Sequence, residues 1–273
     1  MNVPDPRLMR RYLGILGLGA RKPSRQALEE ILRAHLYRIP FENLSKLFHK
    51  EVRRRTDLVE VDEYLEDVER FHFGGTCYAL NRGLYQLLSL LGYDVRLCGA
   101  DMAEPDVHVV VVAMLEGTEY LADVGYGGPF FEAIPLELSK RRVILMGNDR
   151  YEFFRDPAIA RLRLAHYRGG EYKHGYSVNP RGRAVEEFRE IVAASFREDA
   201  TFMNALLLVR FTREGSEVLH NMRFLETRGG VTSTHLLRDK GEAAELAARR
   251  FGMPRSIVQE LITRLPLRTD PYG

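Results

Sequence analysis

The sequence predicts an α+β protein with three regions of different character. Apolar residues recur at helical spacing over much of the first ninety residues. After Gly92 the chain changes to short β-branched or alternating segments, which are typical of an antiparallel sheet or a small barrel and continue to about Asn179. From Val185 helical and hairpin patterns are mixed. Because no Gly/Ser-rich linker intervenes, we expect close packing of the regions 1–92, 93–184 and 185–273.

Three helices are expected in the first region. Ser24 is a candidate N-cap for a helix whose apolar residues follow at helical spacing, and Pro40 ends it. Residues 62–71 form a second, short helix. The third covers 77–93 and stops at Gly92, a residue that favours the C′ position.

The strands of the second region are expected from alternation and β-branched content between turn residues. They are residues 94–102, 107–115, 118–126, 133–138, 150–156, 160–168 and 171–179. In the third region we expect helices over 184–198, 241–251 and 256–265, with hairpins over 204–230.

The composition is that of an ordinary soluble protein, with 45% hydrophobic and 29% charged residues. A formal net charge of +2 is too near balance to favour nucleic-acid binding. The basic run 53–55 fits a solvated face, or a patch for a phosphate-bearing cofactor. Two cysteines make no disulfide framework, and no stretch of about 18 apolar residues or signal peptide is present, so we expect a cytoplasmic protein without a membrane partner.

The stretch "FHFGGTCYALN" places Cys77 directly behind Gly74 and Gly75, at the predicted start of a helix. Paired glycines permit a tight turn that presents the next side chains. The positive end of the helix dipole and the unpaired backbone N–H groups of the first turn both favour a thiolate, which is the nucleophilic form. Taken alone, Cys77 is better explained as a buried apolar spacer, and Cys98 is expected to be a core residue of its predicted strand.

A histidine and an aspartate are predicted to meet on the sheet. His108 opens an otherwise apolar strand, and Glu116-Gly117 is a favourable two-residue hairpin loop. The register set by this loop places Asp123 opposite Val110, which shares a face with His108. The two side chains are then diagonal neighbours, and any loop with an even number of residues keeps them on one face.

These residues suggest a nucleophile, a base and an orienting acid. Asp123 would hold one ring nitrogen of His108, and the other nitrogen would deprotonate Cys77. Separately, His108 fits a core histidine and Asp123 a residue that caps a turn. The three together favour catalysis.

Four motifs give the sequence a resemblance to the arylamine N-acetyltransferase family. "IPFENLS" is similar to the family's V/I-P-F-E-N-L segment, and "GGTCYALN" resembles its R-G-G-x-C-x-E-x-N nucleophile motif. "DVHVVVV" resembles the strand that begins with the catalytic histidine, and "LADVGYGG" resembles V-D-V-G-F-G, which carries the catalytic aspartate. The blocks occur in the family's order within about residues 25 to 135.

The resemblance implies an N-terminal helical bundle, an antiparallel β-barrel and a C-terminal mixed α/β lid around a cysteine-proteinase-like Cys–His–Asp core. Acetyl-CoA would acetylate Cys77, and an arylamine, hydrazine or hydroxylamine would then take the acetyl group. This double displacement uses no metal. The same layout makes Phe41 and Tyr126 aromatic walls of the acceptor pocket, with core packing as the alternative.

Two positions depart from the family pattern. Phe73 replaces the arginine before the glycine pair, and Ala79 replaces the glutamate after the cysteine. If Glu42 pairs with that arginine in the family, its carboxylate needs another partner or water here, because an unpaired buried charge is costly. The nearby cations that could serve are Arg70, His72 and Arg82.

The departures keep other functions open. Some members of the superfamily close macrolactam rings by amide synthesis from a carrier-bound acyl chain, and a thioester hydrolase would use water as the acceptor. A catalytically idle protein that binds CoA or another ligand is the alternative from a different class. The three intact catalytic positions argue against the idle protein.

Overall fold

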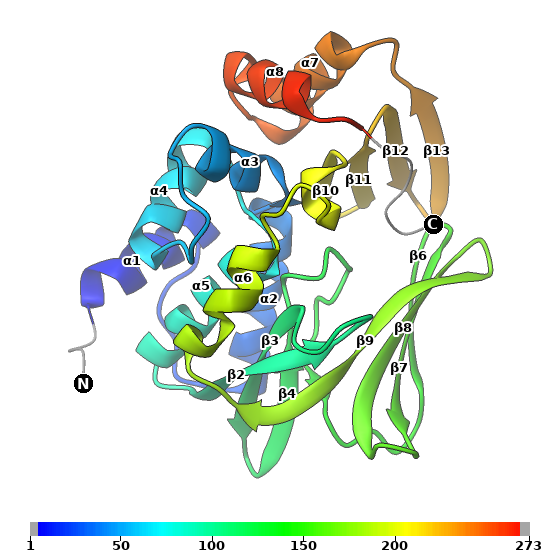
Figure 1. Cartoon of the computed structure of the whole chain (residues 1–273). Helices are drawn as coiled ribbons and strands as arrows, with labels where there is room; N and C mark the ends of the chain where they lie inside the picture. Colours follow the sequence, from blue (N-terminus) through cyan, green and yellow to red (C-terminus); the bar gives the residue numbers. More distant parts are fainter. Residues whose placement is uncertain (1–4, 268–273) are drawn as a thin grey trace.

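Helices form the N-terminal part of the chain in the computed structural model, which describes residues 5–267. Ser24 accepts a hydrogen bond from the Ala27 backbone at 3.1 Å, as expected of the cap. Gly92 adopts a positive φ of 85° just after the fifth helix. The three predicted helices are therefore confirmed, and two more are present. Together they are α1 (Pro6–Leu16), α2 (Arg25–Arg38), α3 (Leu44–Glu51), α4 (Val61–Phe71) and α5 (Cys77–Leu90), grouped on one side of the molecule (Figure 1).

The middle of the chain forms one antiparallel sheet of eight strands, in the order β5-β4-β3-β2-β9-β8-β7-β6. Figure 1 shows that this sheet is curled. Its strands are β2 (Asp94–Asp101), β3 (His108–Leu115), β4 (Thr118–Ala122), β5 (Ile134–Pro135), β6 (Arg142–Met146), β7 (Asp149–Asp156), β8 (Arg161–Arg168) and β9 (Glu171–Gly182).

The expected β-barrel is wrong in one respect, because the sheet does not close. Its two edge strands, β5 and β6, pair with inner neighbours and not with each other. One reason is local: β5 has only two residues, one of which is Pro135. Proline lacks the N–H that a further ladder would need, so it is typical of an edge strand. The twist of the sheet therefore produces an open half-barrel.

A second antiparallel sheet combines one strand of the helical region with four strands of the C-terminal region. Its order is β1-β10-β11-β12-β13, in which β1 (Phe41–Glu42) comes from the helical region. Asn43 fixes this strand by donating to the backbone oxygens of Phe202 and Ala205 at 2.7 and 2.6 Å. The other strands are β10 (Leu207–Phe211), β11 (Gly215–His220), β12 (Arg223–Arg228) and β13 (Val231–Leu236).

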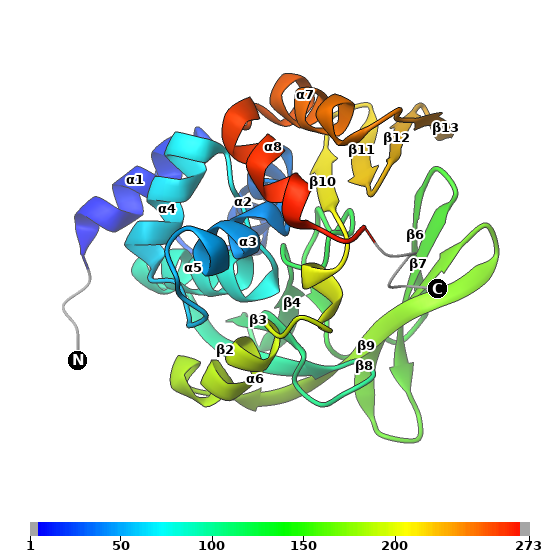
Figure 2. The ribbon, with the colours of Figure 1, turned by 45° about the horizontal axis from the view of Figure 1, so that its top comes forward.

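The remaining helices lie beside these sheets (Figures 1 and 2). They are η1 (Val185–Phe188), α6 (Arg189–Ala194), η2 (Thr201–Met203), α7 (Lys240–Phe251) and α8 (Arg255–Arg264). Arg250 of α7 contacts Glu217 and Glu226 of the five-stranded sheet, which fastens the C-terminal helices to it. As expected, this region combines helices with hairpins.

Strand β3 is apolar throughout because both of its faces are buried. Val109 and Val111 pack into the core around α5, whereas Val110 and Val112 pack into a second core inside the curled sheet. A strand covered on both sides loses the usual alternation of polar and apolar residues. His108 begins this strand on the face that points inside the curl.

Candidate active site

Cys77 is the first residue of α5, and a constrained turn delivers it there. Gly75 has a φ of +96°, which favours glycine. A Cβ on Gly74 would lie 1.8 Å from the backbone oxygen of Pro40, so that position admits no side chain. The Cys77 side chain is 5% exposed and borders a cavity. Cys77 lies in the first turn of α5, where the backbone N–H groups have no acceptor within the helix.

His108 and Asp123 meet as the sequence predicts. Glu116 and Gly117 both have positive φ, as a type I′ hairpin turn requires. The predicted register is confirmed by residue pairs that run as far as Val111 opposite Ala122. His108 Nε2 lies 2.9 Å from Asp123 Oδ2.

Asp123 is held by four hydrogen bonds in a buried position. Its Oδ1 accepts from Asn81 Nδ2 and from the Gly125 backbone, both at 2.8 Å. Its Oδ2 accepts from the Tyr176 hydroxyl at 2.8 Å as well as facing His108. The carboxylate therefore cannot rotate without losing several bonds.

Sequence reasoning gave no role to Asn81 or Tyr176. The spacing of Asn81 carries a signal, because a residue four positions after Cys77 lies on the same face of the helix. Asn81 also accepts from the Val124 backbone at 2.9 Å, so it joins α5 to the segment that carries Asp123. Tyr176 comes from the distant strand β9, and no local pattern marks it.

Electrostatics favour a charged His108–Asp123 pair. Burial alone would lower the pKa of His108, but the Asp123 carboxylate and a hydrogen bond with Cys77 raise it to about 10. Burial alone would raise the pKa of Asp123, but His108, Asn81 and Tyr176 hold it below its ordinary value. At neutral pH the arrangement therefore suits an imidazolium beside a carboxylate, with Cys77 on the other side of the ring.

A cavity of about 940 Å³ connects the predicted site residues. It lies where the helices, the curled sheet and the C-terminal region meet. The predicted residues on its wall are Phe41, Cys77, His108 and Tyr126, and Asp123 lies behind His108. Phe41 contacts the ring of Phe202 edge to face, and Tyr126 stacks on Phe130 with ring centroids 5.4 Å apart.

Lys46 is a buried cation on the same cavity wall that sequence reasoning missed. Its Nζ donates to Ser195 Oγ at 2.5 Å and lies 3.5 Å from the centroid of the Phe196 ring. Burial lowers the pKa of Lys46 to about 7. A single lysine in a helical segment gives no sign in the sequence that it will be buried.

The buried carboxylate of Glu42 is satisfied by backbone donors. Oε1 accepts from the Gly75 N–H at 2.7 Å, and Oε2 accepts from the Ser45 N–H at 2.9 Å. Burial nevertheless raises the pKa of Glu42 above its ordinary value. The carboxylate thus braces the turn before Cys77 without the help of a side-chain cation.

The expectation that a nearby cation replaces the missing arginine as the partner of Glu42 is therefore wrong. Arg70 pairs with Glu66, Arg82 pairs with Glu60, and His72 caps the C-terminus of α4. Arg70 and Arg82 point to surface acids, and His72 caps α4 through its backbone N–H, whereas two backbone N–H groups are already within reach of Glu42.

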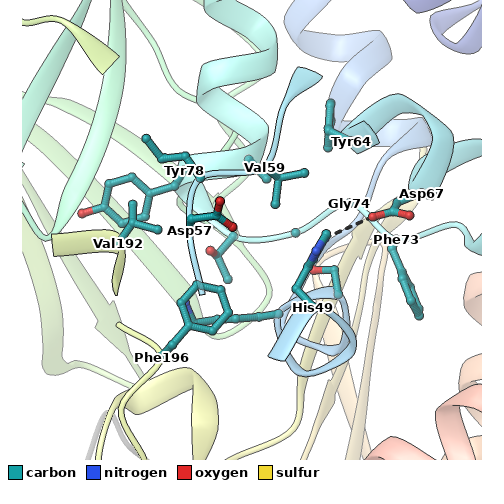
Figure 3. Close-up of a pocket in the computed structure, with 16 residues that line it drawn as sticks. His49, Asp57, Val59, Tyr64, Asp67, Phe73, Gly74, Tyr78, Val192 and Phe196 are labelled. Carbon is teal, nitrogen blue, oxygen red and sulfur yellow. Dashed lines mark ion pairs between the residues drawn. The ribbon is translucent and has the colours of Figure 1, made fainter. Parts of the chain in front are cut away.

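Phe73 and Ala79 do not line the large cavity. They border a small cavity of about 50 Å³ that Gly74 and Gly75 also line, and Figure 3 shows Phe73 and Gly74 at it. Phe73 packs there against the rings of Phe48 and Phe71. The two departures therefore do not touch the large cavity directly, although Lys46, Thr76 and Tyr78 line both cavities.

A second buried histidine–aspartate pair lies beside this small cavity. Figure 3 shows His49 directed at Asp67, and His49 Nε2 lies 3.1 Å from Asp67 Oδ2. Arg53 donates twice to Asp67 at 2.6 Å, and Arg55 pairs with Glu63. Two arginines of the basic run are thus paired with acids of α4, which favours a role in the fold over a phosphate patch.

Two further structural findings concern residues 5–267. No group of three or more His, Cys, Asp or Glu side chains in this range is arranged to hold a metal ion. None of the helices in the same range is both long and apolar enough to cross a membrane.

Comparison with known proteins gives consistent matches. A family model described as N-acetyltransferase matches residues 25–258. The chain is 27% identical to proansamycin X synthase of Amycolatopsis mediterranei, over 91% of this chain and 97% of that protein. It is 24% identical to an arylamine N-acetyltransferase / N-hydroxyarylamine O-acetyltransferase of Salmonella typhimurium, over 90% and 88%.

Solved structures share the fold. The arylamine N-acetyltransferase of Mycobacterium marinum in complex with CoA superposes with a TM-score of 0.80 at 22% identity, covering 94% of this chain and 99% of that one. The enzyme of Mycobacterium abscessus gives 0.76 at 20% identity, with 93% and 94% covered.

Proposed function

Because the chain belongs to the arylamine N-acetyltransferase family, we propose that it moves an acetyl group from acetyl-CoA through a Cys77 thioester to the nitrogen of an arylamine, hydrazine or hydroxylamine. Membership confirms the resemblance of its sequence motifs and makes the chain an enzyme. The observation that carries the mechanism is the buried His108–Asp123 pair, in which His108 lies on the same cavity wall as Cys77.

In the first half-reaction, the Cys77 thiolate attacks the thioester carbonyl of acetyl-CoA. Negative charge then develops on the carbonyl oxygen, and the Cys77 backbone N–H at the start of α5 is one candidate donor to it. The carbon–sulfur bond to CoA breaks, and the imidazolium of His108 gives its proton to the departing thiolate. Free CoA leaves, and the acetyl group remains on Cys77.

In the second half-reaction, the acceptor nitrogen attacks the acetyl carbonyl. His108 takes a proton from that nitrogen, and the bond from carbon to Cys77 breaks to regenerate the thiolate. Asp123 stays ionised and keeps Nε2 of His108 facing it, so the opposite nitrogen serves the reacting atoms. Phe41 and Tyr126 would form the aromatic walls that hold the acceptor.

The CoA complex of the M. marinum relative supports a CoA thioester as the donor. We further expect acylation to be fast and transfer to common arylamines to be slow or selective. Phe73 and Ala79 adjoin the turn that places Cys77, and a misplacement of about 1 Å can cost roughly a hundredfold in rate. Acylation depends mainly on the thiolate, the imidazole and the oxyanion donors, which the chain keeps.

The test is to measure CoA release and N-acetylated product with acetyl-CoA and a panel of anilines, hydrazines and hydroxylamines. Cys77→Ser serves as the inactive control. Acceptor-dependent CoA release with formation of the N-acetyl product supports the proposal. CoA release that is independent of amine, with free acetate as product, would identify a thioester hydrolase. Fast turnover of the whole panel would show that Phe73 and Ala79 are neutral.

Amide synthesis is the second candidate, and two observations favour it. Proansamycin X synthase matches this chain over nearly its full length. The cavity of about 940 Å³ is also near the upper end of the volume that small-molecule sites use, which is about 1,000 Å³. This candidate predicts that Cys77 is acylated faster by a long acyl thioester of N-acetylcysteamine than by acetyl-CoA. The reverse preference favours acetyl transfer.

A further inference from the structure

Lys46 differs from the other cations on the wall of the large cavity. Within residues 5–267, four lysine and arginine side chains border this cavity, and three of them pair with acids. The three pairs are Arg161 with Asp101, Arg163 with Asp156, and Lys173 with Glu171. Lys46 is the fourth, and no carboxylate of the described residues lies within ion-pair distance of it. Only 7% of Lys46 is exposed, whereas the other three are half-buried.

The contacts of Lys46 leave room for one more partner. Its Nζ faces the Phe196 ring and donates to Ser195 Oγ, whose own proton goes to the Val192 backbone oxygen at 2.5 Å. An ammonium has three N–H bonds, so one remains after the hydroxyl and the ring. Burial without an acid is costly for an ammonium, and it lowers the pKa of Lys46 to about 7. A carboxylate in the cavity would supply the missing partner and favour the charged form.

Lys46 is held close to the nucleophile. The buried carboxylate of Glu42 accepts from the N–H of Ser45 and from the N–H of Gly75. Ser45 directly precedes Lys46, and Gly75 lies two residues before Cys77, so one carboxylate fixes both segments. The charge of a Cys77 thiolate also reaches Lys46, because it opposes the fall in the pKa of Lys46 that burial causes. A ligand group that meets Lys46 therefore lies near the carbonyl that Cys77 attacks.

This position selects among the anionic groups that a ligand can offer. In CoA the long pantetheine arm separates the phosphates from the thioester, so the phosphates lie away from Cys77 when the thioester reaches it. A carboxylate on a short acyl chain, or on a small amine that attacks the acyl group, lies close to the reacting carbonyl. It can accept the remaining N–H of Lys46 in a charge-assisted hydrogen bond. Ile191, Ala194 and Phe202 line the same cavity, and an apolar wall strengthens such a bond.

We propose that Lys46 determines substrate specificity by binding a carboxylate near the reacting carbonyl, carried either by the acyl group or by the amine acceptor. The Lys46 ammonium donates to a carboxylate oxygen while Cys77 and His108 perform the acyl transfer. The inference rests on the proposed acyl transfer and names the substrate class of that site.

The test compares carboxylates with their neutral amides in two arms. One arm measures transfer from acetyl-Cys77 to 4-aminobenzoate and to 4-aminobenzamide. The other measures acylation of Cys77 by succinyl and succinamoyl thioesters of N-acetylcysteamine, which contain no phosphate. In one arm we expect Lys46→Met to lower the ratio of carboxylate rate to amide rate about ten- to hundredfold, as loss of one hydrogen bond to a charged group predicts. That arm identifies which molecule carries the carboxylate.

Two further variants separate the charge of Lys46 from its packing. Lys46→Arg keeps a cation and should retain a preference for the carboxylate. Lys50→Met is the matched control, because Lys50 lies four residues further along α3, donates to the Phe196 backbone oxygen at 2.9 Å and does not border the large cavity. It should keep the wild-type ratio in both arms.

A merely structural role for Lys46 would slow the charged and the neutral substrates equally in Lys46→Met, and unchanged ratios in both arms would overturn the inference. An effect of Lys46→Met that appears only with CoA thioesters, and not with those of N-acetylcysteamine, would assign Lys46 to the phosphates of CoA and would also overturn it. Failure of the proposed function is distinguishable, because no thioester would then acylate Cys77.

Calorimetric titration of the unacylated enzyme with 4-aminobenzoate and with succinate tests Lys46 without any transfer. We expect Lys46→Met to weaken the binding of one of the two about tenfold or more. Equal affinities of wild type and Lys46→Met for both carboxylates would overturn the inference whatever the activity.

Discussion

Replacing Asp123 by asparagine removes one charge and keeps the shape of the side chain. The orientation of the new amide is set by its surroundings. Asn81 Nδ2 and the Gly125 N–H both donate to Oδ1 at 2.8 Å, so the amide oxygen must stay on that side. The new NH₂ group then replaces Oδ2, which in the wild type lies 2.9 Å from His108 Nε2.

An N–H directed at His108 Nε2 forces that nitrogen to act as an acceptor. The ring proton must then lie on Nδ1, the nitrogen that serves Cys77, and His108 can no longer take a proton there. The imidazolium is also lost, because burial alone lowers the pKa of His108 once the Asp123 charge no longer raises it to about 10. A wrong tautomer of this kind costs about 10⁴-fold in a related triad, so we expect a loss of about 10³ to 10⁴-fold in the acylation rate.

The assay is single-turnover acylation by p-nitrophenyl acetate, with thermal unfolding by circular dichroism as the check on folding. Asp67→Asn is the matched control, because Asp67 is also buried and also faces a histidine, but borders only the small cavity. We expect the control to acylate within a few-fold of wild type. An Asp123→Asn variant that folds and acylates within tenfold of wild type would refute this account of His108.

Two other predictions follow from the burial of single groups. Iodoacetamide should label Cys77 much faster than Cys98, which is fully buried in β2 and whose pKa burial raises to about 11; equal labelling of the two peptides would contradict this. Lys46→Met should stabilise the protein by a few kcal/mol at pH 7, where burying the ammonium is most costly. The folded pKa of Lys46 is about 7 and the ordinary value 10.5, so the unfolded chain binds more protons between these values. The contribution of Lys46 to the free energy of unfolding should therefore increase as pH rises from 7 to 10, and this increase should be absent in Lys46→Met. Urea unfolding measures both, and a variant less stable than wild type at pH 7 would count against the prediction.

Local signals in the sequence explain which parts of the fold were predictable. The β3–β4 register followed from the Glu116-Gly117 turn and from the two-residue period of a strand, and both are local. Strand β1 was not predictable, because two residues give no periodicity and their partner, β10, lies far along the chain. The open edge of the curled sheet was missed for a similar reason. A short strand with Pro135 shows an edge only when its neighbours are known.

The residues of the site also divide into those that the sequence predicts and those that it does not. Cys77, His108 and Asp123 stand in motifs whose spacing carries the chemistry, and the hairpin register alone is enough to bring two of them together. Tyr176 and His174 are lone polar residues in an alternating strand. Only the curl of the sheet, which pairs β9 with β2, brings them to the cavity. Single residues delivered by tertiary structure leave no pattern to interpret.

The central claim is that Cys77 carries the acetyl group. Intact-mass measurement of the protein after mixing with acetyl-CoA, without an acceptor, tests this most directly. We predict a gain of about 42 Da, the increment of one acetyl group in exchange for a proton, located by peptide mapping on Cys77 and absent in Cys77→Ser. Cys98→Ala should acquire the same adduct as the wild type. An unmodified wild-type protein, or an adduct that persists in Cys77→Ser, would contradict the claim.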